Sequence, residues 1–464
     1  MNTTIKRPIF VFSLLFAFFL VGCTHRQSNT VIIHSFPEDS ISEINVFPLS
    51  GGLMGTTFEG EKTCRFVIDT VEVYNFYSFS NENRFITRLF ITPGDSVSFK
   101  TIHGENYCDL LFEGKNAAHY NYASKKRKSL LLEEEPDYFS NPDIDLLTYK
   151  QQLQAYRDKE NEFLSNYKKE HVVSEDFINY ASAEINNQYA FKLYQASYFN
   201  KHSPLPADYL NDAIITQNPL SWHAFDALQF KYIYCSPDLN IERIYNAILN
   251  EICPKLQSGL LSGLITWFTK KGDRVYKKSL LQIMDQIEKT SKDSTLLTRV
   301  KESRPYYLLS GTILPDSILD KTYLRSLQSK QKITLRQFFD NYKNRAIYLD
   351  LWSSWCAPCR EAIRESASGK SYLAGKQIEV VYISIDTDEK AWIQVAIEDE
   401  VTENQYMLLE DNDRPIEHYL RINAIPRYIF FNKNHEIEVL SAPRPTQKMF
   451  EDLKEIIERY SEKL

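Results

Sequence analysis

The chain has 464 residues and a formal net charge of −7 at pH 7. Its length predicts about two to four domains, and a hydrophobic content of 43% is enough for ordinary cores. The only short basic run lies at residues 125–128, and an acidic chain of this kind is not typical of proteins that bind nucleic acids.

The first 22 residues have the pattern of a signal peptide, with Lys6 and Arg7 before an apolar run at residues 9–20. This run is shorter than the roughly 20 apolar residues that span a membrane. An uncleaved anchor and a cleaved lipoprotein both stay open. The segment at residues 20–23 resembles a bacterial lipobox. That resemblance implies cleavage before Cys23, lipidation of Cys23 and a periplasm-facing place in the cell envelope, on a membrane that it does not specify.

Residues 23–115 predict an all-β N-terminal domain, an antiparallel sandwich or a barrel-like fold. Short runs rich in β-branched or aromatic residues lie at 31–33, 44–46, 65–68, 85–91 and 96–99, and turn residues at 50–52 and 93–95 separate them. Residues 91–97 and 112–116 resemble a β-rich, DUF4369-like module that precedes the thioredoxin domain in many Bacteroidota lipoproteins. No catalytic residue is implied by this resemblance.

Residues 116–310 predict a central α-helical domain of six or more helices packed as a bundle. Apolar residues recur at three- and four-residue steps on a polar segment: Leu146, Tyr149, Leu153, Tyr156, Phe163 and Tyr167. Gly272 is predicted to end a helix further along the chain.

Four cysteines lie outside the motifs that carry chemistry: Cys64, Cys108, Cys235 and Cys253. In an exported protein they could pair within segments, as Cys64 with Cys108 and Cys235 with Cys253. They could equally be reduced core residues, and both interpretations stay open.

Residues 311–464 predict an α/β domain that contains the chain's most specific motif. A strand at 323–327 and a capping box of Thr334 with Gln337 come first. Further elements are a buried strand at 378–386, helices at 390–400 and 412–420, strands at 429–431 and 437–440, and a helix at 449–460.

Cys356 and Cys359 are two residues apart, between an apolar strand at 346–352 and a helix that starts near Pro358. A helix N-terminus can lower the pKa of such a cysteine to about 3.5–7.5, which makes it a nucleophile at neutral pH. A zinc site would need four Cys or His ligands, and the sequence has no second pair at suitable spacing. The pattern therefore favours redox chemistry over a metal site or a static disulfide.

The motif Trp355, Cys356, Pro358, Cys359, with Asp350 six residues before the first cysteine, resembles the thioredoxin superfamily. Pro426, after Ile425 and before an apolar strand, resembles the cis-proline loop of that family. The long interval between Cys359 and Pro426 is similar to membrane-tethered relatives of the TlpA and ResA type. The resemblance implies a thioredoxin-like fold and a thiol:disulfide oxidoreductase without a cofactor or metal.

The resemblance also implies roles for these residues. Cys356 would attack a disulfide, Cys359 would resolve the mixed disulfide, and Asp350 would take the proton of Cys359. Pro426 would hold the partner strand and Trp355 would form an apolar wall. The partners would be exported protein disulfides or dithiols and a membrane dithiol donor of the DsbD or CcdA type, with the reducing direction favoured.

Two other functions stay open. One is a lipid-anchored binding or scaffold protein whose redox domain is an accessory. The other, a peroxiredoxin, is disfavoured because residues 352–355 occupy the place where its peroxide-binding proline and threonine should precede the cysteine.

Overall fold

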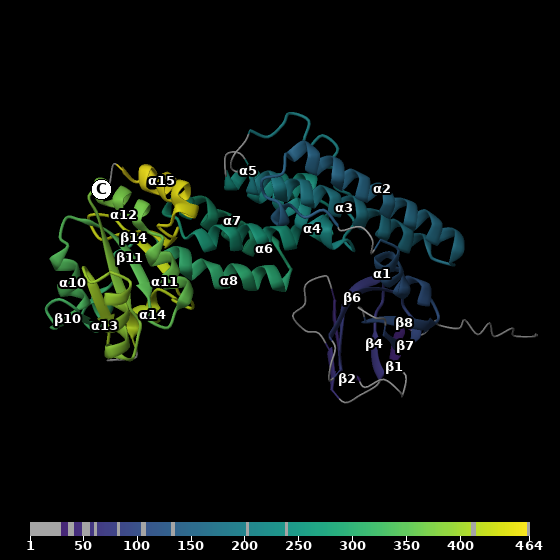
Figure 1. Ribbon diagram of the computed structural model, residues 1–464, viewed down its shortest axis with the longest axis horizontal. Helices are drawn as coiled ribbons and strands as arrows, with labels where there is room; N and C mark the ends of the chain where they lie inside the picture. Colours follow the sequence, from purple (N-terminus) through teal and green to yellow (C-terminus); the bar gives the residue numbers. More distant parts are fainter. Residues whose placement is uncertain are drawn as a thin grey trace, which may run out of the picture. The chain divides into compact units, whose positions relative to one another are not determined.

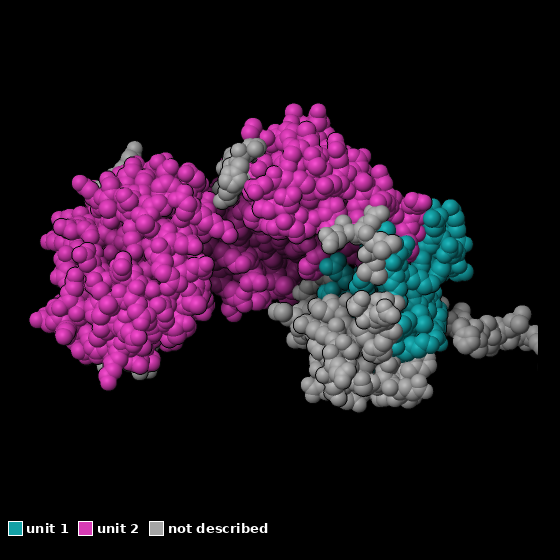
Figure 2. Space-filling view, viewed as in Figure 1, with its two compact units in different colours: residues 1–134, 165–178 teal, residues 135–164, 179–464 magenta. Residues whose placement is uncertain are grey.

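The computed structural model describes residues 29–35, 41–48, 56–59, 63–80, 84–103, 108–130, 135–200, 204–236, 240–409 and 414–461. The chain divides into two compact units, Met1–Glu134 with Ser165–Ile178, and Glu135–Leu164 with Asn179–Leu464 (Figure 2). This division runs through helices α2 (Leu146–Glu170) and α3 (Glu175–Phe199). The predicted domain boundaries stay predictions, and the signal peptide and Cys23 lie outside the described residues.

The first unit is built on two four-stranded sheets, with strand orders β4-β1-β7-β8 and β3-β2-β5-β6. Their strands are β1 (Thr30–Ser35), β2 (Ile41–Pro48), β3 (Thr56–Glu59), β4 (Thr63–Val67), β5 (Glu72–Ser80), β6 (Arg84–Ile91), β7 (Ser96–His103) and β8 (Cys108–Gly114). Aromatic side chains join the sheets, since the ring of Phe76 on β5 lies 5.5 Å from that of Phe99 on β7. The predicted β-rich N-terminal region is confirmed.

One pairing in the first unit differs from the predicted antiparallel arrangement. Strands β1 and β7 are parallel, with Ile33 opposite Val97. The strands of the other sheet lie between them in the sequence, and this long connection lets both strands run the same way.

The turn at residues 93–95 is stabilised by hydrogen bonds to the buried carboxylate of Asp95. Asp95 is 0% exposed and accepts hydrogen bonds from the Thr92 N–H (2.8 Å), Asn116 Nδ2 (2.6 Å) and the Tyr120 hydroxyl (2.9 Å). Tyr120 belongs to α1 (Ala117–Leu130), so Asp95 joins the turn to the first helix.

The predicted helical region is also confirmed. In the second unit, η1 (Tyr138–Ser140) and parts of α2 and α3 are followed by α4 (Trp222–Gln229), a π-helix η2 (Phe230–Tyr234), α5 (Ile241–Glu251), α6 (Pro254–Lys271), η3 (Arg274–Tyr276), α7 (Lys277–Thr290) and α8 (Ser294–Leu309). Leu146, Tyr149 and Leu153 of the predicted stripe are buried. Gly272 ends α6 in the left-handed conformation, as predicted.

The C-terminal part is an α/β domain in which helices surround a central sheet (Figure 1). The sheet has seven strands in the order β10-β9-β13-β12-β11-β14-β15. The elements of the domain are α9 (Asp316–Leu319), β9 (Tyr323–Ser326), β10 (Lys332–Thr334), α10 (Leu335–Asn341), β11 (Ala346–Trp352), α11 (Ala357–Arg364), α12 (Ala367–Gly375), β12 (Ile378–Ser384), α13 (Glu389–Glu398), β13 (Gln405–Leu408), α14 (Pro415–Tyr419), β14 (Arg427–Phe431), β15 (Ile437–Ala442), η5 (Gln447–Met449) and α15 (Phe450–Arg459). The capping box of Thr334 and Gln337 is present.

Alternate residues of β11 belong to different cores. Ile347, Leu349 and Leu351 share a core with α10, α14 and helices α5 to α8. Tyr348 packs with α12 and α15, and Trp352 packs with α11 and α13. The sheet is therefore covered by helices on both faces, which explains why every residue of β11 is buried.

Backbone groups from the helical segment before this domain form hydrogen bonds with β15, the edge strand of the sheet. The Leu440 N–H on edge strand β15 donates to the Gly272 carbonyl (3.0 Å), and the Gly311 N–H donates to the Ile437 carbonyl (2.7 Å). Beside these bonds, Arg274 forms ion pairs with Glu436 (2.7 Å) and with the fully buried Glu438 (3.0 Å). Unpaired strand edges promote unwanted association, and the backbone at the ends of α6 and α8 covers this one.

Three of the four remaining cysteines have described side chains, and none of these three forms a disulfide. Cys64, Cys235 and Cys253 are free thiols, so the Cys235–Cys253 and Cys64–Cys108 disulfides are not formed. The side chain of Cys108 lies outside the described part of the structure. Burial raises the pKa of the Cys64 thiol to about 12 and also raises that of Cys235. These two thiols are therefore poor nucleophiles.

Replacing Gly272 by Ala tests the junction between α6 and β15. Gly272 has φ +59°, and an added Cβ would lie 2.8 Å from the Leu440 Cβ and 3.1 Å from the Ser441 nitrogen. We expect Gly272→Ala to lower the free energy of unfolding by about 1–3 kcal/mol in urea denaturation. Gly375→Ala is the matched control, since a Cβ there meets nothing within 4 Å. Equal effects of both substitutions would contradict this account of the junction.

Candidate active site

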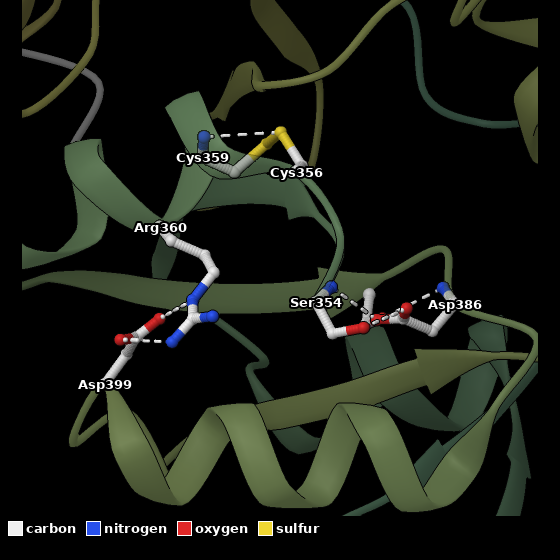
Figure 3. Close-up of a disulfide and its surroundings, with 7 residues drawn as sticks. Ser354, Cys356, Cys359, Arg360, Asp386 and Asp399 are labelled. Atoms are coloured by element: carbon white, nitrogen blue, oxygen red, sulfur yellow. Dashed lines mark hydrogen bonds and ion pairs between the residues drawn. A yellow bond between two sulfur atoms is a disulfide. The ribbon is translucent and has the colours of Figure 1, made fainter.

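The dithiol motif lies where a central strand passes into a helix. Strand β11 pairs with β12 on one side and β14 on the other, and α11 begins directly after Cys356, its N-cap residue. Cys356 and Cys359 form a disulfide with their Cα atoms 5.2 Å apart. The Cys359 N–H points at Cys356 Sγ, 3.2 Å away (Figure 3). Unpaired N–H groups at this helix end favour a thiolate on Cys356 once the disulfide is reduced.

Both cysteines are buried in the disulfide form, whereas Trp355 is exposed to solvent. Cys359 is 0% and Cys356 4% exposed, in a core that also contains Trp352 and Trp392. Trp355, by contrast, is 69% exposed. Its side chain lines a hollow of about 250 Å³ together with Ser354, Ala357, Arg360 and Arg364. Trp355 therefore contributes to the outer surface beside the disulfide, whereas Trp352 forms the apolar wall behind it.

Asp350 is a buried acid on the same face of β11 as Trp352. It is 2% exposed, and its register partners on the neighbouring strands are Tyr382 and Tyr428. Burial raises the pKa of Asp350 to about 7, although the positive charge of Lys370 acts in the opposite direction. Because Tyr382 also belongs to the core around the cysteines, it connects the surroundings of Asp350 with the disulfide. A carboxyl group in this state can bind or release a proton near neutral pH.

The predicted proline loop approaches the same core. The Ile425–Pro426 peptide bond is cis, as the resemblance implied. Ile425 packs against the cluster that contains both cysteines, and β14, which starts at Arg427, is antiparallel to β11. The tertiary structure thus brings Cys356, Cys359, Asp350 and the Pro426 loop to one region of the domain.

Sequence reasoning did not select three polar residues that support this region. Gln405 is 1% exposed, and its Oε1 accepts hydrogen bonds from the indoles of Trp352 (3.3 Å) and Trp392 (3.4 Å). Asp386 and Asp399 contact residues on either side of the cysteines (Figure 3). Asp386 is the last residue of the predicted strand at 378–386, and this position only weakly indicated that it lies near the cysteines. No sequence signal marked Gln405 or Asp399.

Within the described part of the chain, no three His, Cys, Asp or Glu side chains are grouped as metal ligands.

The C-terminal part of the chain is similar to known proteins. Residues 344–437 match the family model described as thioredoxin-like. No curated protein matches the chain. The C-terminal part is a thioredoxin-like domain, and the solved structures that it matches include thiol-disulfide oxidoreductases.

Three of these structures illustrate the likeness. The thioredoxin domain of a Bacteroides vulgatus thiol-disulfide oxidoreductase is 18% identical over 33% of this chain and 97% of its own, with a TM-score of 0.27. A thiol-disulfide oxidoreductase from Bacteroides fragilis is 22% identical over 30% and 94%, with a TM-score of 0.24. A secreted disulfide oxidoreductase of Mycobacterium tuberculosis is 15% identical over 31% and 99%, also with a TM-score of 0.24.

The raised pKa of Asp350 predicts how stability depends on pH. The folded chain keeps the Asp350 proton up to about pH 7, whereas the unfolded chain loses it near the ordinary pKa of 3.8. Proton binding by the folded state therefore stabilises the protein below pH 4, and this stabilisation is lost as the pH rises to 7. Relative to Asp350→Asn, we expect the oxidised wild type to lose about 4 kcal/mol between pH 4 and pH 8 in urea denaturation. A difference that stays constant with pH would contradict the raised pKa.

Proposed function

We propose that this protein is a membrane-anchored, extracytoplasmic thiol:disulfide oxidoreductase that exchanges disulfides with exported proteins, in the reducing direction. The observation that carries the proposal is the Cys356–Cys359 disulfide at the N-terminus of α11, inside a thioredoxin-like domain. A helix N-terminus stabilises the thiolate form of a nucleophilic cysteine, whereas a buried structural cysteine gains nothing from that position.

The first step of the proposed reaction is an exchange at Cys356. Its thiolate attacks one sulfur of a partner disulfide, a new bond joins Cys356 Sγ to that sulfur, and the other partner sulfur leaves as a thiolate that takes up a proton. The exposed Trp355 and the Pro426 loop lie on elements next to Cys356, where they would contact the partner chain.

The second step resolves the mixed disulfide. Cys359 loses its proton and attacks Cys356 Sγ, which forms the intramolecular disulfide and releases the partner as a dithiol. Two electrons have then passed from this protein to the partner. Asp350, with a pKa raised to about 7 by burial, would accept the Cys359 proton. A dithiol donor in the membrane, of the DsbD or CcdA type, would return two electrons and restore the reduced form.

The anchor is proposed from the N-terminal segment, where Cys23 follows an apolar run that resembles a signal peptide. Acyl chains on Cys23 would hold the chain at the membrane, since each buried CH₂ contributes about 0.8 kcal/mol. Among the helices that the structure describes, none has both the length and the apolar character of a membrane span.

A redox titration tests the activity and its direction. We expect the full-length protein, equilibrated with glutathione or dithiothreitol buffers, to show a single two-electron transition at about −250 mV or lower. A reducing protein needs such a potential to pass electrons to partner disulfides. A transition near about −120 mV would reverse the proposed direction, since it is typical of disulfide-forming oxidants.

Two cysteine variants are the controls for this titration. Cys356→Ala with Cys359→Ala should show no transition, and Cys359→Ala alone should accumulate a mixed disulfide with a reducible protein substrate such as insulin. If the double variant retains partner binding in cell-envelope extracts and the wild type reduces no protein disulfide, the scaffold function is favoured instead.

Lipidation has a direct test in a bacterial host that processes lipoproteins. With a radiolabelled fatty acid, we expect label on the wild-type chain and recovery of the chain in the membrane fraction. Cys23→Ala should remove the label because the acylated thiol is absent. Cys253→Ala, which changes a free thiol far along the chain, is the matched control. Label that persists in Cys23→Ala would contradict the proposed anchor.

A further inference from the structure

The loop before Cys356 is held by a buried carboxylate from the neighbouring strand. Asp386 is 2% exposed and lies just after β12. It accepts hydrogen bonds from the Ser354 N–H (2.8 Å) and the Ser354 hydroxyl (2.7 Å). Ser384 completes the cluster, with its hydroxyl donating to Asp386 Oδ2 at 2.6 Å. Ser354 is two residues before the nucleophile, so this contact fixes the approach of the chain to Cys356 (Figure 3).

Helix α11, which contains Cys359, is held by a second carboxylate. The Asp399 side chain is 3% exposed and lies at the end of α13. Arg360 donates to both of its oxygens, from Nε (2.7 Å) and from a terminal nitrogen (3.1 Å), and Arg364 adds a third bond at 3.0 Å. Burial alone would raise the pKa of Asp399, but the bonds from Arg360 and Arg364 outweigh it, so that the pKa is lowered. Asp399 thus stays charged and keeps α11 in place.

These two contacts lie on opposite sides of the dithiol. We infer that Asp386 and Asp399 are positioning residues that hold the two ends of the Ser354–Arg360 segment and so favour closure of the Cys356–Cys359 disulfide. The inference rests on the proposed redox function of this disulfide. Neither aspartate is proposed to react with the sulfur atoms.

The physical reason is effective concentration. A disulfide forms readily when the two sulfurs are already held at bonding geometry, and less readily when the segment between them is free to move. By linkage, contacts that favour the closed geometry are stronger in the oxidised protein than in the reduced protein. A contact that merely stabilises the fold would support both forms equally and leave the redox equilibrium unchanged.

The equilibrium constant for disulfide formation, measured with the full-length protein in glutathione buffers, tests the inference. We expect Asp386→Asn and Asp399→Asn each to lower this constant about fivefold, because each loses charge-assisted hydrogen bonds to the segment. Ser354→Ala and Arg360→Gln change the opposite partner of each contact and should act in the same direction. These two variants keep the test decisive if an aspartate variant fails to fold.

Two matched controls separate positioning from general stability. Asp388→Ala removes the N-cap of α13, whose carboxylate accepts from the Lys390 N–H at 2.9 Å, without contact to Ser354. Glu398→Gln weakens the outer contact of Arg360, with a Glu398 side chain that is 46% exposed. Both controls should leave the equilibrium constant at the wild-type value, even where Asp388→Ala lowers the free energy of unfolding.

The outcomes are distinguishable. Wild-type constants in all four test variants, with normal exchange by the wild type, would overturn the positioning role and leave the proposed function in place. A wild-type protein that shows no transition in either glutathione or dithiothreitol buffers would overturn the redox function, and the inference with it. A loss of unfolding free energy that is equal in the oxidised and reduced forms of Asp386→Asn would also contradict positioning.

Discussion

The parallel pairing of β11 with β12 is the constraint on which the candidate site depends. Trp352 lies opposite Ser384, and the Ile385 N–H donates to the Trp352 carbonyl at 2.9 Å. Parallel strands end at the same edge of a sheet, so the chain leaves β11 toward Cys356 beside the residues that follow β12. The same pairing encloses Asp350 between neighbouring strands. A shift of one residue would turn Asp350 to the opposite face of the sheet and away from the cysteines.

The pKa values of two aspartates near the dithiol are shifted in opposite directions because their surroundings differ. Asp350 lies among tyrosines, its Oδ1 atom has no hydrogen-bond partner among the described residues, and burial raises its pKa to about 7. Asp399 is also shielded from solvent, but the two arginines that bind it keep its pKa low. The first can exchange a proton near neutral pH, and the second is a fixed charge. In the proposed mechanism, proton transfer would therefore fall to Asp350 and positioning to Asp399.

The thioredoxin-like sheet and the helical segment before it share one core. Helices α5 to α8 contribute to the same cluster as β11, β12 and β14, and the backbone around Gly272 and Gly311 covers edge strand β15. Asp273, which is 2% exposed, accepts hydrogen bonds from Arg459 and Tyr460 at the C-terminal end of the domain. The helical segment therefore stabilises the thioredoxin-like domain. Substitutions that disrupt its packing should lower the stability of the sheet.

The sequence by itself determined features that depend on a few adjacent residues: the Cys356–Cys359 spacing, the strand before it, the capping box at Thr334 and the end of α6 at Gly272. Local sterics, periodicity and capping rules act over one turn or one strand, which is why they could be predicted. Only the tertiary structure decided that Ser354 meets Asp386, 32 residues away, and that Arg274 meets Glu438, 164 residues away. It also decided that Trp355 is exposed while Trp352 is buried, although the two are equally apolar. Strand register and the packing of distant helices settle these contacts, and neither follows from the pattern of any single segment.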